Sequence, residues 1–499
     1  MHSLIITMRA DPTDQSEPAD TPARALRART SGTRPFSGVH GTLHPSDMRI
    51  PLVLHGSAFT SRTRRAEPAG PVDAAATGYK IVTGAALDDV DGRVLTESLR
   101  KVTDSPRFHR HPTSRSQPSV TTPITSDHNP DDLRRREDPV FMSGNLPPDV
   151  PEVFDTQYGA ALDAVLTGRS PSRLIGAHQY RGSDRDRAAG AAFTARRLAT
   201  APAPERVVIA NGTQSILTQL LSGLVPHGGV LAVEELTYPT IRTFVSMLGI
   251  GLAPVAMDGE GIDPDAFERI CRTRRPAALY TMPTLQNPTT GTMGDDRRRA
   301  ITDVCRRHGV SVIEDDIYSL LPTDAPLPLS AYLPELSWYV LGTAKSIAAG
   351  LKVAYVVAPD EESAKRLFWP GVRSTYWMVA PINAAVATRL VEDDGATAII
   401  DAVRAETRAR HELVTAALSG IGHRTTPESL HVWLPVPPGR TAADFASATL
   451  AAGASIGTSG TFYVGADTAP ETVRIGVGAP PDRGALQRGL TAVRHAYHQ

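Results

Sequence analysis

Hydrophobic and polar positions divide the chain near residue 140. The segment before Glu137 is rich in Pro, Ser, Thr, Arg and Asp, and only isolated apolar fragments interrupt it. A segment of this composition buries too little apolar surface to offset the entropy of an ordered chain. We therefore predict that residues 1–139 form a disordered amino-terminal extension. Met48 and Met142 are alternative starts for a shorter product, and the sequence does not choose among them.

From Phe141 onward, short apolar runs alternate with amphipathic stretches, which is the pattern of an α/β domain with a mainly parallel sheet. Five of these runs are short and apolar enough to be buried strands. They span residues 206–210, 229–234, 277–281, 310–314 and 338–342. The pattern predicts a large domain over residues 140–378.

The pattern changes again past about Ala380. A long polar-apolar helix pattern runs through Arg410, and two apolar runs follow at residues 431–436 and 473–477. Helices followed by a few separated strands are typical of an α+β unit. We predict a second, smaller domain over residues 379–499.

Composition and charge narrow the classes of function. The 499 residues carry a net charge of -1 at pH 7, so no global charge favours nucleic acid or an anionic membrane as a partner. No apolar run reaches the roughly eighteen residues of a spanning helix, and the apolar stretch at the start is too short for a signal peptide. Cys271 and Cys305 have neither disulfide-framework nor metal-ligand spacing. We predict a cytoplasmic protein with no metal site and no nucleic-acid or membrane partner.

Three short segments carry the candidate chemistry, and each follows the end of a predicted strand. They are residues 283–291 with Asn287, residues 314–318 with Asp315 and Tyr318, and residues 342–346 with Lys345. In open α/β sheets the ligand crevice lies at the carboxyl ends of the strands, so we expect these loops to converge. Taken singly, Asp315 is as easily a helix cap and Asn287 an Asx turn. Together the segments supply an amide, an acid, a phenol and an amine.

From about Val140 to its end, the chain resembles a fold-type I pyridoxal-phosphate aminotransferase of class I/II. It is similar to aminoadipate and kynurenine aminotransferases and to the aminotransferase-like half of MocR regulators. In that family an Asn-Pro turn, an Asp-x-x-Tyr segment and the Schiff-base lysine follow in this order. The resemblance implies an α/β large domain with a mainly parallel seven-stranded sheet, a smaller α+β carboxyl-terminal domain, pyridoxal 5′-phosphate as cofactor, and a homodimer.

The resemblance also implies roles at the cofactor ring. Lys345 forms the Schiff base and carries the α-proton, Asp315 faces the pyridine nitrogen, and Tyr318 and Asn287 bind the phenolic oxygen. Lys345 lies inside a mostly apolar stretch, which favours a desolvated amine over an ordinary surface lysine. Tyr238 matches the aromatic residue that stacks on the ring.

The phosphate site is implied by a glycine turn that opens a helix after the first predicted strand. Gly212, Thr213 and Gln214 resemble the family's phosphate cup, and Tyr180 resembles a tyrosine donated to the phosphate across a dimer interface.

Two departures from the family pattern concern the loop that carries the lysine. Gly342 and Ala344 stand where hydroxyls are usual, and Lys352 stands where arginine is usual, seven residues after Lys345. We expect Thr343 to supply a hydroxyl and Lys352 to neutralise the phosphate as a point charge, without the planar fork of arginine.

For the substrate, Arg474 matches the family's arginine that binds the α-carboxylate, and Gly144 lies in a segment that closes over the same group. Asn287 is a further expected substrate contact. The resemblance implies transfer of an amino group from an L-amino acid to a 2-oxo acid. The sequence does not identify the amino donor.

Two alternatives stay open. Fold-type I scaffolds also support lyase, cyclase and oxidative deaminase chemistry with the same cofactor. A MocR-like ligand-sensing regulator would need a winged helix-turn-helix, and the first segment lacks the required helical periodicity.

Overall fold

The computed structural model describes residues 5–7, 53–55, 139–168, 170–176, 178–366 and 378–499. The chain divides into two units, residues 1–123 and residues 124–499. In the first unit, β1 (Ile5–Thr7) and β2 (Val53–His55) form an antiparallel pair. The rest of the predicted extension up to residue 138 lies outside the described residues.

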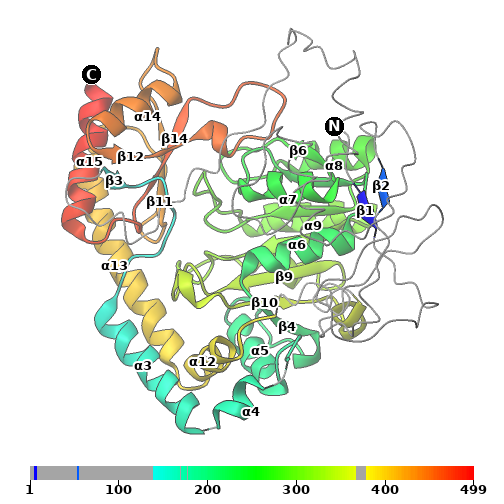
Figure 1. The fold of residues 1–499 in the computed structure, drawn as a ribbon. Coiled ribbons are helices and arrows are strands. Elements are labelled where there is room, and N and C mark those ends of the chain that lie inside the picture. The colour runs from blue at the N-terminus through cyan, green and yellow to red at the C-terminus, as the bar shows by residue number, and fades with distance from the viewer. Residues whose placement is uncertain (1–4, 8–52, 56–138, 169, 177, 367–377) are drawn as a thin grey trace, which may run out of the picture. The chain divides into compact units, whose positions relative to one another are not determined.

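A seven-stranded sheet forms the centre of the second unit (Figure 1). Its strands are β4 (Val207–Ala210), β5 (Val230–Glu234), β6 (Gly251–Val255), β7 (Ala278–Thr281), β8 (Ser311–Asp315), β9 (Ser337–Gly342) and β10 (Ala354–Val357). Their order is β4-β10-β9-β8-β7-β5-β6, and β10 runs antiparallel to both of its neighbours while the other pairs are parallel. The predicted mainly parallel seven-stranded sheet is confirmed.

The two faces of the sheet are covered by different helices, and the strands alternate between them. Val233, Tyr280 and Ile313 belong to the core cluster that contains the buried residues of α6 (Thr213–Leu224) and α7 (Thr240–Leu248). The residues before them in sequence, Ala232, Leu279 and Val312, belong to a second core cluster that contains buried residues of α8 (Pro264–Arg274) and α9 (Asp295–His308). Successive side chains of a strand point to opposite faces, so Asp315, two residues after Ile313, lies on the α6 side.

The structure describes further helices between residues 139 and 366. They are α3 (Pro151–Gly168), α4 (Pro171–Ile175), α5 (Asp184–Leu198), α10 (Leu329–Tyr332) and a helix at residues 361–366, with 3-10 turns at Pro204–Arg206 and Ala349–Leu351. Ser183 and Asp186 form a capping box at the start of α5. The Asp263 side chain accepts a hydrogen bond from the Asp265 N–H, and Pro264 takes the first position of α8. Local sequence therefore marks where α5 and α8 begin.

The carboxyl-terminal part has its own sheet, in the order β11-β14-β13 with antiparallel pairing. Its elements are α12 (Pro381–Glu392), α13 (Gly395–Ala417), β11 (His431–Pro435), α14 (Ala442–Ala451), β12 (Ala454–Ser455), β13 (Gly457–Thr458), a 3-10 turn at Ser459–Thr461, β14 (Thr472–Gly476) and α15 (Arg483–His498). The helix pattern predicted through Arg410 is two helices, because Asp394 takes a left-handed conformation with φ of 59° between them. The division at residues 378 and 379 stays a prediction.

The segment that begins with β3 (Val140–Phe141) forms a separate two-stranded parallel sheet with β12 and then contacts β14. β3 pairs with β12, and the Gly476 N–H donates to the Met142 carbonyl at 2.6 Å. A Cβ at Gly476 would lie 2.0 Å from the Gly144 carbonyl oxygen, so only glycine permits this approach. The residues after β3 are thereby held along β14, which carries Arg474.

Other features are reported for the described residues alone. None of their helices is long and apolar enough to cross a membrane. No group of three or more of their His, Cys, Asp and Glu side chains is placed to hold a metal ion. Cys271 and Cys305 are buried free thiols.

Candidate active site

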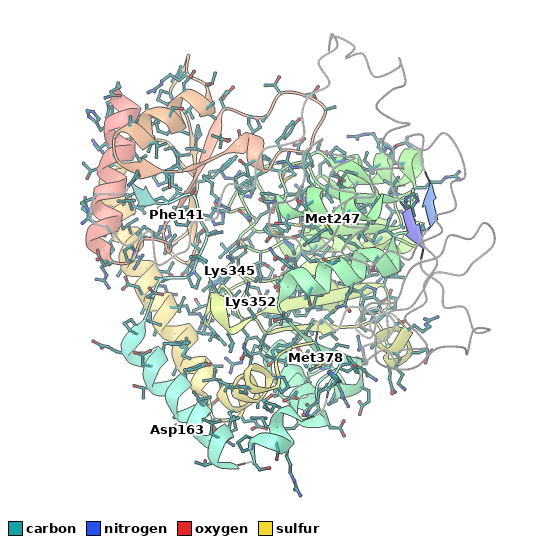
Figure 2. All side chains as sticks on the ribbon, viewed as in Figure 1. Phe141, Asp163, Met247, Lys345, Lys352 and Met378 are labelled. Atoms are coloured by element: carbon teal, nitrogen blue, oxygen red, sulfur yellow. The ribbon has the colours of Figure 1, made fainter. Side chains whose placement is uncertain are left out.

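Lys345 projects from a tight loop directly after β9. The N–H and the hydroxyl of Thr343 both donate to the Val353 carbonyl, at 3.1 and 2.9 Å, and so close the loop. The amine of the partly buried Lys345 donates to the backbone carbonyl of Asn145 (Figure 2 labels the lysine). Burial, and then the positive charge of Arg474, lower the pKa of this amine to about 8. A substantial neutral fraction near physiological pH makes it a usable nucleophile and base.

Asp315 is a buried acid with one carboxylate oxygen that accepts a hydrogen bond and a second that has no partner. Ile313 is aligned with Tyr280 in the β7-β8 ladder, so Asp315 lies on the same face as Tyr280 and one step further along. The Tyr280 hydroxyl donates to Asp315 Oδ2 at 2.9 Å, whereas Oδ1 is buried with no hydrogen-bond partner. Burial raises the pKa of Asp315 to about 7. The free oxygen suits a donor supplied by a ligand.

Arg474 connects β14 to the Asn-Pro loop and to the segment after β3. Its Nη1 donates to Asn287 Oδ1 at 2.7 Å and its Nη2 to the Ser143 carbonyl at 2.6 Å. The guanidinium also lies over the Phe462 ring, 4.7 Å from its centroid. Burial lowers the pKa of Arg474 to about 10, so the group stays charged at neutral pH. The predicted substrate residues Arg474, Asn287 and Gly144 therefore lie in one region.

The start of α6 meets the loop that carries the lysine. Gly212, at φ of 80°, is the N-cap of α6, and a Cβ there would lie 3.8 Å from the Lys352 side chain. A Cβ on Gly342 would lie 2.6 Å from the Thr213 hydroxyl. The glycine that departs from the family pattern is thus explained, because a hydroxyl-bearing side chain at 342 would collide with Thr213.

Other predicted cofactor contacts have definite surroundings. Gln214 Nε2 donates to the Tyr238 hydroxyl at 2.8 Å, which brings these two residues together. The Thr343 proton is used by the Val353 carbonyl, so this hydroxyl has only its lone pairs for a ligand. The hydroxyls of Ser346 and Ser215 are buried and have no partner. Tyr180 stacks on His178 with centroids 5.4 Å apart, and its role across a dimer interface stays a prediction.

Comparison with known proteins now decides the family. The family model described as aminotransferase class I and II matches residues 171–493. The chain belongs to this family. Pyridoxal phosphate is the cofactor that these enzymes share.

Relatives of two kinds resemble this aminotransferase-family chain. It is 28% identical over 294 residues to YdeF of Bacillus subtilis (strain 168), described as an uncharacterized HTH-type transcriptional regulator, covering 58% of this chain and 62% of that protein. It is 28% identical over 235 residues to a 2-aminoadipate transaminase of Thermus thermophilus, covering 46% and 57% of the two chains. The matched segments span less than two thirds of the length of either relative.

A solved structure shows the same fold. The α-aminoadipate aminotransferase LysN of Thermus thermophilus, complexed with N-(5′-phosphopyridoxyl)-L-leucine, superposes with a TM-score of 0.63 at 22% identity. The match covers 72% of this chain and 92% of that one. The predicted fold-type I architecture is confirmed.

Several residues of the site were not predicted from the sequence of this family member. Gln286 Nε2 donates to the Leu236 carbonyl at 2.6 Å and to Glu234 at 3.2 Å, and the buried Arg298 donates to the Pro283 carbonyl at 3.0 Å. These contacts hold both ends of the loop that carries Asn287. No motif marks such tethers, because each partner is distant in sequence.

Tyr280 and His431 were also missed as site residues, although both lie in predicted strands. Tyr280 becomes visible once the β7-β8 register is known, because it shares a face with Asp315. His431 is fully buried and its Nδ1 lies 3.1 Å from Asn145 Nδ2. A polar residue in an otherwise apolar strand was the signal available for either residue.

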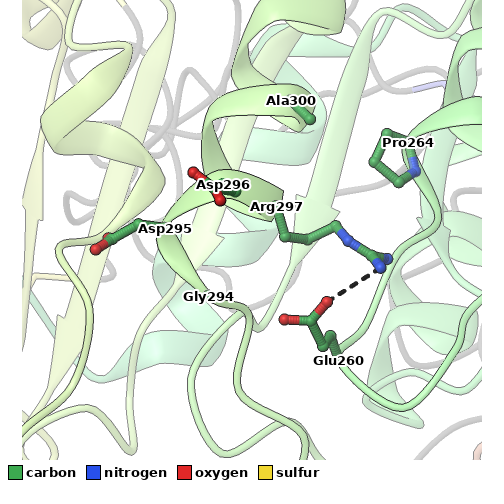
Figure 3. Close-up of a pocket in the computed structure, with 7 residues that line it drawn as sticks. All are labelled: Glu260, Pro264, Gly294, Asp295, Asp296, Arg297 and Ala300. Atoms are coloured by element: carbon green, nitrogen blue, oxygen red, sulfur yellow. Dashed lines mark hydrogen bonds and ion pairs between the residues drawn. The ribbon is translucent and has the colours of Figure 1, made fainter.

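A surface hollow elsewhere on the chain lacks this chemistry. It has a volume of about 660 Å³. Figure 3 shows its lining residues, which are Glu260, Pro264, Gly294, Asp295, Asp296, Arg297 and Ala300. Arg297 pairs with Glu260 at 3.1 Å and with Asp258 at 2.7 Å, so its charge is already neutralised. None of the candidate site residues lines this hollow.

Asp315 is expected to make the stability of the cofactor-free protein depend on pH. Its folded pKa of about 7 lies above the unfolded value of about 3.9, so the folded state binds more protons between these pH values. The contribution of protonated Asp315 to the free energy of unfolding is fully present below about pH 4 and is lost as the pH rises through 7. Asp315→Asn removes this pH dependence, so the stability of the variant relative to wild type should rise by roughly 2.5 kcal/mol between pH 5 and pH 8. Urea unfolding of both cofactor-free proteins at pH 5 and pH 8 measures this change. The same difference in stability between variant and wild type at both pH values would contradict the prediction.

Proposed function

We propose that this protein is a pyridoxal-phosphate-dependent aminotransferase that moves an amino group from an L-amino acid to a 2-oxo acid. The observation that carries the proposal is one site that combines three groups: the Lys345 amine, the free oxygen of Asp315 and the fork of Arg474. The three groups would serve covalent attachment of the cofactor, contact with its ring nitrogen and binding of the substrate carboxylate, respectively. They come from segments that are distant in the sequence. Lys345 would hold the cofactor covalently.

The residues present fit this cofactor. A pyridinium ring supplies an N–H donor, and Asp315 Oδ1 is a buried acceptor without a partner. A phosphate supplies acceptors, and the start of α6, the free Ser215 and Ser346 hydroxyls and Lys352 supply donors. The bound cofactor would supply an electron sink for negative charge at the substrate α-carbon.

The chain's own groups would divide the remaining work. The Lys345 amine, with its lowered pKa, would take the proton from the α-carbon and return it. Asp315, once paired with a charged ring N–H, would be held ionised despite its burial. Tyr318 stays protonated because burial raises its pKa well above the usual range, so it would act as a hydrogen-bond donor. Arg474 would orient the substrate through its carboxylate.

Arg474→Lys is expected to weaken donor binding more than it slows chemistry. The guanidinium offers two parallel donors to a carboxylate, and an ammonium offers a single point charge. Loss of one charge-assisted hydrogen bond should raise KM for the amino donor by roughly 10-fold to 100-fold, with a smaller change in kcat. Steady-state kinetics measure both constants. Arg424→Lys, at an exposed arginine that contacts the Gly259 carbonyl, is the matched control. Equal KM values for Arg474→Lys and the control would contradict the role of Arg474.

The reaction type can be tested without an acceptor. The protein loaded with cofactor is mixed with a panel of single L-amino acids, and the absorption and the 2-oxo acid released are followed together. Transamination predicts one 2-oxo acid per cofactor and a lasting change of the absorption spectrum for the right donor. Repeated turnover without any acceptor would support the lyase, cyclase or oxidative deaminase alternatives instead.

A ligand-sensing regulator is the second candidate, and the similarity to YdeF favours it. In that case the full chain would bind a defined DNA duplex with an affinity that changes when an amino acid binds to the cofactor. Electrophoretic mobility shift with promoter fragments from its own gene neighbourhood tests this. Sequence-specific binding, together with no release of 2-oxo acid, would replace the enzymatic proposal.

We also propose that the protein acts as a cytoplasmic homodimer, as the family resemblance implies. Exposed apolar side chains on the described surface support an interface, notably Ile175 at 58% exposure and Met247 at 73%. Sedimentation equilibrium of the loaded protein should give twice the mass of one chain. A monomer with full activity would contradict the proposal.

A further inference from the structure

His431 is a buried imidazole that the mechanism above does not use. It is the first residue of β11 and is fully inaccessible to solvent. Its Nδ1 lies 3.1 Å from Asn145 Nδ2, its Nε2 lies 3.3 Å from the Gln286 carbonyl oxygen, and its ring meets the Tyr318 ring edge-on with centroids 6.0 Å apart. It therefore joins three segments: the residues after β3, the carboxyl-terminal sheet and the loop that carries Asn287.

The two contacts fix the tautomer of this imidazole. A carbonyl oxygen only accepts hydrogen bonds, so Nε2 must carry the proton that it donates to Gln286. In a neutral ring Nδ1 is then an acceptor, and it takes an N–H of the Asn145 amide. Burial, followed by the positive charges of Arg474 and Lys345, lowers the pKa of His431 to about 3, and His411 acts in the same direction. The ring is neutral throughout the physiological range.

The Asn145 amide carries the effect of His431 to Tyr318. Its Nδ2 has two protons, and the second is donated to the Tyr318 hydroxyl oxygen at 2.8 Å. With both donors committed, the Asn145 amide has a single orientation. The Tyr318 oxygen accepts, so the proton of Tyr318 remains for another acceptor in the site. An O–H whose oxygen already accepts a hydrogen bond is also a stronger donor.

We propose that His431 is a positioning residue that acts through Asn145 to aim the Tyr318 hydroxyl as a donor at the phenolic oxygen of the cofactor. The identity of that acceptor rests on the proposed function, whereas the His431–Asn145–Tyr318 chain is a property of the cofactor-free protein. In the structure Asn145 reaches Tyr318 while the preceding Met142 carbonyl accepts a hydrogen bond from the Gly476 N–H of β14.

The first test needs no cofactor. Nitrogen-15 NMR of histidine-labelled, cofactor-free protein gives the tautomer and charge of each ring, and loss of one signal pair in His431→Asn assigns His431. The expected result is an Nε2–H tautomer that does not titrate between pH 5.5 and pH 8.5. An Nδ1–H tautomer, or a ring that gains a proton in this range, would overturn the proposal even if the protein proves to be an aminotransferase.

The second test follows the pH midpoint at which the visible absorption of the bound cofactor changes. A hydrogen bond donated to the phenolic oxygen stabilises the negative charge that this oxygen carries when the cofactor is deprotonated. A weaker hydrogen bond therefore raises the pH midpoint. His431→Phe keeps the ring contact with Tyr318 and loses both nitrogens, and we expect it to raise the midpoint by about one pH unit. His431→Asn keeps an acceptor near the Nδ1 position and should shift it less.

A double mutant separates positioning from general structural damage. In a Tyr318→Phe background, His431→Phe should add no further shift, because the hydroxyl through which it acts is gone. Equal shifts in both backgrounds, or none in either, would overturn the proposal. If wild type shows no cofactor absorption at all, the proposed function fails, and the NMR result still decides whether His431 has the tautomer that the His431–Asn145–Tyr318 chain requires.

Discussion

Replacing Lys345 with alanine is expected to lower the transamination rate by about 10⁴-fold or more, the largest effect of any single substitution. The change removes the covalent attachment point and the base that moves the α-proton together. Lys352 does not stand in for it, because Lys352 lies by Gly212 at the start of α6. Stopped-flow absorption with saturating amino acid measures the rate of the first half-reaction directly.

The control for this change is a lysine of the same kind outside the site. Lys365 is exposed and pairs with Glu361, so Lys365→Ala should leave the rate within about twofold of wild type. Added methylamine should restore part of the lost rate in Lys345→Ala, since a small amine can replace the missing base. A Lys345→Ala variant with near-normal activity would remove the lysine from the mechanism.

Asp315→Asn is expected to slow the reaction by roughly 10²-fold to 10³-fold while the protein stays folded. Asparagine has the same shape and still accepts from Tyr280, but it presents an uncharged group to the ring nitrogen. The ring is then no longer held in its protonated form, and negative charge at the α-carbon is less stabilised. The rate of α-proton exchange with solvent deuterium, followed by NMR, measures this step.

The neighbouring acid gives the matched control. Asp316 directly follows the end of β8, accepts a hydrogen bond from the Tyr339 hydroxyl at 2.9 Å and pairs with Arg197 at 3.5 Å. Asp316→Asn should therefore lower the thermal unfolding temperature and leave the exchange rate within a few-fold of wild type. Equal loss of rate in the two variants would show that the Asp315 effect reflects stability rather than chemistry.

Much of the fold could be predicted from the chain because its strands are short, apolar and separated by helices. All five strands predicted from these runs are present in the sheet. The strands β6 and β10 were not predicted, and β6 contains Gly251 and Pro254, residues that strands disfavour. Its place at the edge of the sheet explains how they are tolerated. Strand pairing partners were not predicted from the residues, since pairing depends on contacts between distant segments.

The residues of the candidate site likewise fall into those that local sequence indicates and those that depend on contacts between distant segments. Lys345, Asp315 and Asn287 were found because they follow strand ends, where parallel sheets gather ligand-binding loops. Tyr280, Asn145 and His431 were not assigned to the site from the sequence, since their contacts there depend on strand register or on pairing across more than a hundred residues. The roles proposed for all these residues stay predictions.

The measurement that tests the central claim most directly is reduction of the purified protein with sodium borohydride, followed by proteolysis and peptide mass spectrometry. Borohydride fixes an imine between a lysine and pyridoxal phosphate as a stable secondary amine. The account predicts the mass of a reduced phosphopyridoxyl group on Lys345 and its absence from Lys352 and Lys365. A modification on another lysine, or an unmodified Lys345 in protein saturated with the cofactor, would contradict the account.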